Sequence, residues 1–245
     1  MLFGFYYKVS EFIRMPHQEP LAISLPDKLD FSTFVEGDNP AAVSMIKDAV
    51  GRGAHEFFYI FGPKGCGKTH FLNALFNTSF AQNNHCFFMD LQNVRQLGTE
   101  CLGVPLSLVI LLDNVDCIAK DEECELALFR FFNRWYDKKE GTLVISGEKS
   151  PDAISFFKKD LNTRLSSGVS FKFEYLDEHA CVRALLKRAA LRQIRLSEHT
   201  ASFMVRHFNH DMTSLVALLD RLEKQEIAER HNLTIPFVKN FLKLK

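Results

Sequence analysis

The residues of this chain best suited to chemistry lie in one run, Gly62-Pro63-Lys64-Gly65-Cys66-Gly67-Lys68-Thr69. The run has the form G-x-x-x-x-G-K-[ST] at every fixed position. Glycines let consecutive backbone N–H groups turn inward around a polyphosphate, the lysine reaches the β- and γ-phosphates, and the threonine hydroxyl can bind Mg²⁺. The run therefore predicts a phosphate-binding loop. The helix expected after it, from His70 onward, would direct its positive dipole end at the same anion.

A second chemical feature follows the apolar run 107–112, which ends in Asp113-Asn114. A carboxylate at the carboxyl end of a buried strand, downstream of a phosphate loop, is placed to hold Mg²⁺. We therefore expect Thr69 and Asp113 to be the protein groups near the metal. A hydrolysing enzyme usually has a further acid next, but Asn114 is an amide and cannot act as a base. Asp116 is an alternative acid close by.

The elements needed to position these residues can be read from the apolar patterns. Strands are predicted at 57–61, 86–89, 107–112, 142–146 and 169–173, the last one at a sheet edge because it alternates. Ser146, at the end of the fourth strand, would lie beside Asp113 if the two strands are neighbours. Asn39 and Pro40 predict the start of a helix. A helix is also predicted over 121–139, and Arg164 falls in a short polar segment before the last strand.

From Asp177 onward the pattern is helical only, with stripes at i, i+3, i+4 and i+7 that indicate a small core. The sequence thus predicts an α/β domain with a parallel sheet, followed by a small α-helical lid domain. The expected boundaries are a tail over 1–29, the α/β domain over 30–176 and the lid over 177–245.

Composition narrows the classes of function. The 245 residues are 47% hydrophobic and 24% charged, as in ordinary globular proteins. The formal net charge is zero, which argues against a large nucleic-acid footprint. The six cysteines form no C-x-x-C pair and are read as buried free thiols. Because the chain lacks an apolar run near the ~20 residues of a membrane span and lacks a secretion signal, we expect a cytoplasmic protein.

The proline-rich tail contains Gln18-Glu19-Pro20-Leu21-Ala22-Ile23. A glutamine followed by two spaced aliphatic residues suits an extended peptide that places side chains in a pocket of a partner. Six residues alone favour the alternative, an ordinary linker.

Several of these segments also carry a resemblance to a known family. The run from Phe31 to Asn39, the phosphate loop and Leu111-Leu112-Asp113-Asn114 together resemble the AAA+ domain of the bacterial replication initiator DnaA. The stretches 189–192 and 233–239 are more similar still to Hda, a family of DnaA-related regulatory inactivators. The resemblance covers about residues 18–245. Its motifs range from strong, in the phosphate loop, to weak, in the tail, and together they are specific.

This resemblance implies roles for particular residues. The tail segment with Gln18, Leu21 and Ile23 is similar to the hexapeptide with which the family docks on the replicative sliding clamp. Arg164 matches the family's arginine finger, which acts in trans on a partner's γ-phosphate. Gly37 and Asn39 match the family's adenine-side contacts. The complete set of implied nucleotide-binding residues is Gly62, Pro63, Lys64, Gly65, Cys66, Gly67, Lys68, Thr69, His70, Gly37, Asn39, Asp113, Asn114 and Ser146.

The chain departs from the family pattern at one position in particular. Most relatives carry an arginine where this chain has Thr213, and that arginine senses the phosphates of the bound nucleotide. Asn114, in contrast, is shared with the Hda-like members. The chain also stops after the lid, so the initiator's helix-turn-helix domain is not expected, nor is specific origin binding.

The sequence and the resemblance together predict a negative regulator of replication initiation. Its partners would be the DNA-loaded sliding clamp and DnaA, and it would reach DNA only indirectly, through the clamp. We expect no association with a membrane, and homo-oligomers are possible. Its ligands would be an adenine nucleotide, ADP or ATP, with Mg²⁺. Independent ATP turnover is expected to be low. Two alternatives stay open: a self-sufficient AAA+ ATPase that acts as a loader or remodeller, and a nucleotide-binding scaffold on the clamp.

Overall fold

The computed structural model describes residues 29–208, 212–229 and 233–243. Its first part is a five-stranded sheet in which every strand pair is parallel, in the order β2-β3-β4-β1-β5. The strands are β1 (Phe57–Phe61), β2 (Cys86–Asp90), β3 (Val109–Asp113), β4 (Thr142–Gly147) and β5 (Val169–Lys172). The predicted five-stranded parallel sheet is confirmed, and β5 lies at the predicted edge.

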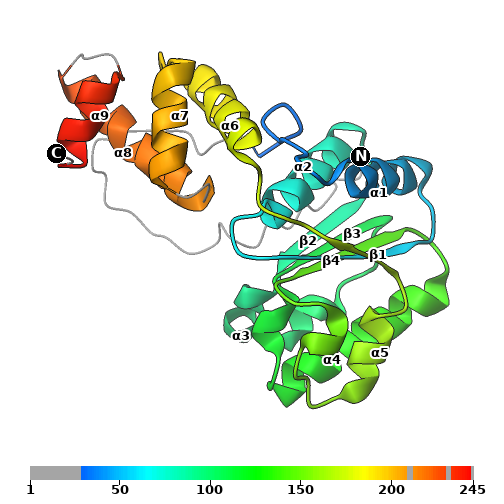
Figure 1. Ribbon diagram of the computed structural model, residues 1–245. Helices are drawn as coiled ribbons and strands as arrows, with labels where there is room; N and C mark the ends of the chain where they lie inside the picture. The colour runs from blue at the N-terminus through cyan, green and yellow to red at the C-terminus, as the bar shows by residue number, and fades with distance from the viewer. Residues whose placement is uncertain (1–28, 209–211, 230–232, 244–245) are drawn as a thin grey trace, which may run out of the picture.

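Helices cover both faces of this sheet (Figure 1). On one face, α1 (Pro40–Arg52) and α2 (Lys68–Ala81) form a core with Phe58, Ile60 and Leu111. On the other face, α4 (Glu122–Lys138) and α5 (Lys159–Leu165) pack on Tyr59 and Ile110. Adjacent residues of β1 and β3 thus point to opposite cores, which explains why these strands are apolar throughout. The short α3 (Val94–Leu97) follows β2.

The chain after the sheet is helical (Figure 1). Its helices are α6 (Glu178–Leu191), α7 (Glu198–His207), α8 (Met212–Glu229) and α9 (Ile235–Phe241). They enclose a separate core that includes Met204, Leu215 and Leu219, as the stripes predicted. The side chains of Asp177 and Ser197 accept hydrogen bonds from backbone N–H groups at the starts of α6 and α7, at 2.6 and 3.1 Å. These helices form the lid.

Two local predictions differ from the structure. Asn39 does precede α1, but its side chain does not cap the helix; its Nδ2 donates instead to Glu36 O at 3.1 Å. The short polar segment around Arg164, for which no helix was predicted, forms α5, where Leu161 and Leu165 are fully buried. In the described part of the chain, no helix is long and apolar enough to cross a membrane.

Candidate functional site

The phosphate loop joins β1 to α2 and depends on glycine at two positions. Gly67 precedes α2 with φ +99°, a left-handed conformation that costs other residues free energy. Gly62 packs directly against the backbone carbonyl of Phe173, where an added Cβ would overlap the oxygen. The loop therefore requires glycine at both positions, because a residue with a Cβ could not adopt this backbone conformation or this close approach without strain.

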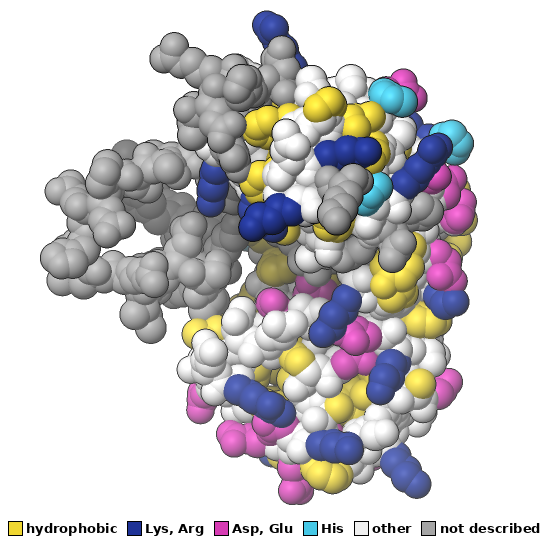
Figure 2. Space-filling model, turned by 60° about the vertical axis from the view of Figure 1, so that its left-hand side comes forward, with side chains coloured by type: hydrophobic (Ala, Val, Ile, Leu, Met, Phe, Trp, Pro, Cys, Tyr) yellow, Lys and Arg dark blue, Asp and Glu magenta, His cyan; other side chains and the backbone are white. Residues whose placement is uncertain are grey.

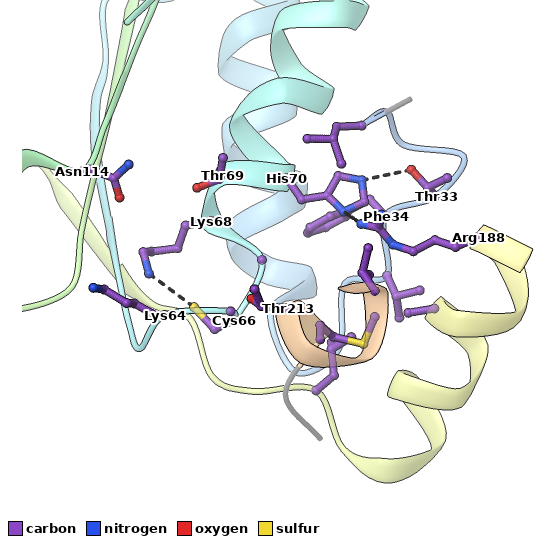
Figure 3. Close-up of a pocket in the computed structure, with 18 of the residues that line it drawn as sticks. Thr33, Phe34, Lys64, Cys66, Lys68, Thr69, His70, Asn114, Arg188 and Thr213 are labelled. Carbon is purple, nitrogen blue, oxygen red and sulfur yellow. Dashed lines mark hydrogen bonds between the residues drawn. The ribbon is translucent and has the colours of Figure 1, made fainter. Parts of the chain in front are cut away.

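Lys68 already lies inside the loop. Its side chain is buried, and Nζ donates to Gly62 O at 2.7 Å and to Pro63 O at 2.9 Å, with Cys66 Sγ at 3.7 Å (Figure 3). Neutral carbonyls are weaker partners for an ammonium group than an anionic phosphate oxygen. A phosphate entering the loop would therefore compete well for Lys68.

Asp113 is the last residue of β3 and is fully buried. Its Oδ1 accepts hydrogen bonds from the Ser146 hydroxyl and, at 3.1 Å, from Asn114 N. Ser146 thus lies beside Asp113, as predicted from the strand ends. Burial raises the pKa of the Asp113 carboxyl, while the hydroxyls of Ser146 and Thr69 act in the opposite direction.

The second oxygen of Asp113, Oδ2, is buried and has no hydrogen-bond partner among the described residues. An unsatisfied carboxylate oxygen in the neighbourhood of the Thr69 hydroxyl suits Mg²⁺, which prefers oxygen ligands and keeps several waters. In the same described ranges, no group of three or more His, Cys, Asp or Glu could hold a metal by itself. The residues present fit a Mg²⁺ ion that arrives together with phosphates, held by Thr69 and Asp113.

Asn114 has a left-handed backbone, with φ 60°. Its Nδ2 donates to Asp90 Oδ1 at 3.0 Å. Asp90 is the last residue of β2 and pairs in register with Asp113. Asp90 is not among the predicted site residues, although it follows the apolar run 86–89 in the way that Asp113 follows the run 107–112. Asp116, considered as an alternative acid, accepts hydrogen bonds from the backbone N–H groups of Glu148 and Lys149.

These groups surround a cavity of about 630 Å³ between the α/β domain and the lid, a size that suits a small-molecule ligand. Figure 2 shows the surface hollowed between the lower, α/β lobe and the upper, lid lobe. Its lining residues come from the segment before α1, the loop, the strand ends and the lid: Leu29, Thr33, Phe34, Val35, Lys64, Gly65, Cys66, Gly67, Lys68, Thr69, His70, Asp90, Gln92, Asn114, Glu148, Leu176, Ala184, Arg188, Met212, Thr213 and Val216.

The lid contacts the loop side of this cavity through Arg188 of α6. The Arg188 side chain is mostly buried, and its Nη2 lies 3.2 Å from Nδ1 of His70 (Figure 3). His70 Nε2 lies 3.0 Å from the Thr33 hydroxyl, which extends the chain of contacts to the segment before α1. The neighbouring Lys187 donates to Phe34 O at 3.3 Å. Nothing in the sequence pattern singled out Arg188.

Six of the predicted nucleotide-binding residues are not among the described residues that line the cavity: Gly62, Pro63, Gly37, Asn39, Asp113 and Ser146. Gly62 and Pro63 hold the Lys68 ammonium from behind, and Asp113 and Ser146 lie buried beneath the strand ends. Gly37 contacts Leu176, a lining residue. Their direct contact with a nucleotide stays a prediction.

Arg164 lies apart from the cavity. It sits in the last turn of α5, on the face of the sheet that is opposite to α1 and α2 (Figure 1). Its guanidinium carbon lies 5.4 Å from the ring centroid of Tyr136, whose side chain is about half exposed. The predicted clamp-binding residues Gln18, Leu21 and Ile23 lie outside the described residues.

Comparison with known proteins agrees with this architecture. Residues 177–242 match the family model of the Hda lid domain, and residues 106–172 match that of the bacterial DnaA ATPase domain. Among solved structures, domain III of the Thermotoga maritima replication initiation protein DnaA is similar with a TM-score of 0.76 and 20% identity, over 89% of this chain and 96% of that one.

Two further structures extend the comparison. The AMPPCP-bound DnaA of Aquifex aeolicus has a TM-score of 0.66 and 19% identity, over 85% of this chain and 71% of that one. The Thermotoga maritima RuvB Holliday junction branch migration motor has a TM-score of 0.61 and 12% identity, over 83% and 67%. At these identities the likeness shows the fold.

A phosphate loop between β1 and α2, an acid at the end of β3 and a helical lid define the AAA+ class of proteins. Within that class, the two family models make this chain a Hda/DnaA-like AAA+ protein of a DnaA-related regulator family.

Proposed function

We propose that this protein is a negative regulator of replication initiation that promotes hydrolysis of the ATP bound to DnaA. Arg164 enters the partner's nucleotide site in trans, while the protein holds an adenine nucleotide with Mg²⁺ in its own cavity. The tail segment 18–23 attaches the protein to the DNA-loaded sliding clamp. Such an arrangement would restrict DnaA–ATP to the period before the clamp is loaded.

The observation that carries this proposal is the position of Arg164. The described residues that line the cavity do not include Arg164, and α5 lies across the sheet from α2. A cation that lies outside the lining of its own nucleotide cavity, on the other face of the sheet, supports a role toward a second molecule. Arginine fingers supplied in trans can raise hydrolysis rates by about 10³–10⁵.

The protein's own nucleotide site has independent support. The buried Lys68, the unpaired oxygen of Asp113 and the cavity under the lid would together hold the phosphates and a Mg²⁺ ion. The similar Aquifex aeolicus structure is an AMPPCP-bound DnaA. Asn114 in place of a second acid supports slow turnover in this site, so that the nucleotide would serve to hold the lid and core together.

The test is ATP loss from DnaA loaded with [γ-³²P]ATP, with and without this protein and with and without clamp loaded on DNA. We expect acceleration only when both are present. Double replacement of Gln18 and Leu21 by Ala should remove both the clamp binding and the acceleration. Unchanged ATP loss despite normal clamp binding would contradict the proposal and favour a scaffold. Rapid ATP turnover by the protein alone would favour a self-sufficient ATPase.

A further inference from the structure

The strand ends beside the phosphate loop bring an unexpected carboxylate into the cavity. Asp90 ends β2, Asp113 ends β3, and the two residues are directly paired in the sheet. Asn114 donates its Nδ2 hydrogen bond to Asp90 Oδ1 at 3.0 Å. Asp90 and Asn114 line the same cavity as Lys68 and Thr69. The acid that is missing at position 114 is thus present on the neighbouring strand, hydrogen-bonded to the amide that occupies that position.

The other acids near the loop have different partners. Asp116 accepts the Glu148 and Lys149 N–H groups, at 2.5 and 3.2 Å, and is not among the described residues that line the cavity. Glu148 does line the cavity, but its Oε1 lies 3.3 Å from Lys64 Nζ. Asp113 is buried and assigned to the cation. Asp90 is therefore the carboxylate best placed to face an attacking water.

The hydrogen bonds to Asp90 also fix the orientation of its carboxylate. Its Oδ1 accepts from Gln92 N at 3.0 Å as well as from Asn114 Nδ2. These two donors hold the carboxylate against the start of the turn after β2. A fixed carboxylate loses less freedom when it binds a water than a mobile one does.

We propose that Asp90 is the catalytic base of a slow hydrolysis of ATP in this protein's own site, and that Asn114 positions it. A water oxygen forms a bond to the γ-phosphorus, and the bond from that phosphorus to the β,γ-bridging oxygen breaks. The electron pair of the broken bond leaves with ADP. The proton of the water passes to the Asp90 carboxylate and then to solvent, and inorganic phosphate is the second product. This inference rests on the nucleotide site proposed above and not on the action of Arg164.

The experiment uses the full-length protein loaded with [γ-³²P]ATP and Mg²⁺, without DnaA or clamp. The rate at which the bound nucleotide loses its γ-phosphate is measured for the wild type, D90N, D116N and D90N/N114D. D137N provides the same chemical change on the exposed surface of α4. Equilibrium titration with a fluorescent ATP analogue measures affinity separately from the rate. Asn at position 90 can accept the same two hydrogen bonds, so the fold should be retained.

We expect D90N to slow hydrolysis about 100-fold, the usual effect of losing a general base, with affinity changed less than about threefold. D116N and D137N should hydrolyse within about threefold of the wild type. The double variant, which returns the carboxylate to position 114, should regain at least about tenfold over D90N.

Three results would overturn the inference: a wild-type rate no faster than that of ATP in buffer, a D90N rate equal to the wild type, or a loss in D90N explained by weaker ATP binding. A large loss in D116N alone would assign the base to Asp116 instead. None of these results bears on ATP loss from DnaA, because in that experiment the labelled ATP is bound to DnaA and not to this protein. A failure here and a failure of the proposed regulation are therefore distinguishable.

Discussion

At the scale of single residues, the candidate site is held in place before any ligand binds. Lys68 is oriented by the carbonyls of Gly62 and Pro63, and Asp113 by Ser146 and its own neighbour Asn114. The buried Oδ2 of Asp113, in contrast, has no hydrogen-bond partner within the described residues. Side chains held in this way bind a charged ligand without much reorganisation.

Replacement of Lys68 by Ala tests the phosphate loop at this scale. The variant loses charge-assisted hydrogen bonds worth about 1.5–3 kcal/mol, so ATP affinity should fall about 10- to 100-fold. Lys224→Ala, an exposed lysine of α8, is the matched control and should bind as the wild type does. Isothermal titration of both variants with MgATP gives the answer, and equal affinities would mean that the nucleotide does not occupy this loop.

At the scale of elements, one buried carboxylate connects α4 to the start of α5. Glu125 is 1% exposed and accepts hydrogen bonds from three backbone N–H groups, those of Lys120, Phe157 and Lys158, at 2.8, 3.1 and 2.9 Å. Phe157 and Lys158 lead directly into α5. Glu125 therefore helps to fix the helix that carries Arg164.

Glu125→Gln should lower the free energy of unfolding by about 2 kcal/mol, because the amide presents an N–H₂ group to a backbone N–H that needs an acceptor. The same replacement at the exposed Glu122 should cost less than about 1 kcal/mol. Urea unfolding measures both. An equal loss of unfolding free energy in the two variants would show that Glu125 contributes no more than an exposed carboxylate of the same helix. It would contradict the role of Glu125 in fixing α5.

The elements also show what sequence patterns can predict. The strand ends were predicted to within about two residues, because strands buried on both faces are runs of apolar residues bounded by polar ones. The seven-residue α5 was missed, since only Leu161 and Leu165 mark its buried side. Asp113 and Ser146 were predicted to lie side by side on condition that their strands are neighbours, and β3 does pair with β4. The pairing of Asp90 with Asn114 and the contact of Arg188 with His70 depend on tertiary geometry that no local pattern records.

At the scale of the whole molecule, the cavity and Arg164 lie on different sides of the sheet. The cavity lies between the lid and the α1–α2 side, whereas Arg164 lies on the α4–α5 side of the sheet (Figure 1). Thr213, at the start of α8, lines the same cavity as Cys66 of the loop (Figure 3). A positive charge at position 213 would therefore face the cavity in which the phosphates are expected to bind.

Thr213→Arg should therefore strengthen ATP binding about tenfold, the equivalent of about 1.4 kcal/mol, and increase the thermal stabilisation that saturating ATP gives. Thr213→Gln matches much of the length without the charge and should bind as the wild type does. Titration calorimetry and thermal unfolding with and without MgATP compare them. A gain in the Gln variant as large as in the Arg variant would show that packing of the lid, and not charge, limits the affinity.

The measurement that tests the central claim most directly is ATP loss from DnaA in the presence of the clamp on DNA, with Arg164→Ala compared with the wild type. Arg130→Ala is the control, an exposed arginine on α4 of the same face. We expect Arg164→Ala to lose the acceleration while it binds the clamp and its own nucleotide normally, and Arg130→Ala to keep it. Full acceleration by Arg164→Ala would contradict the account.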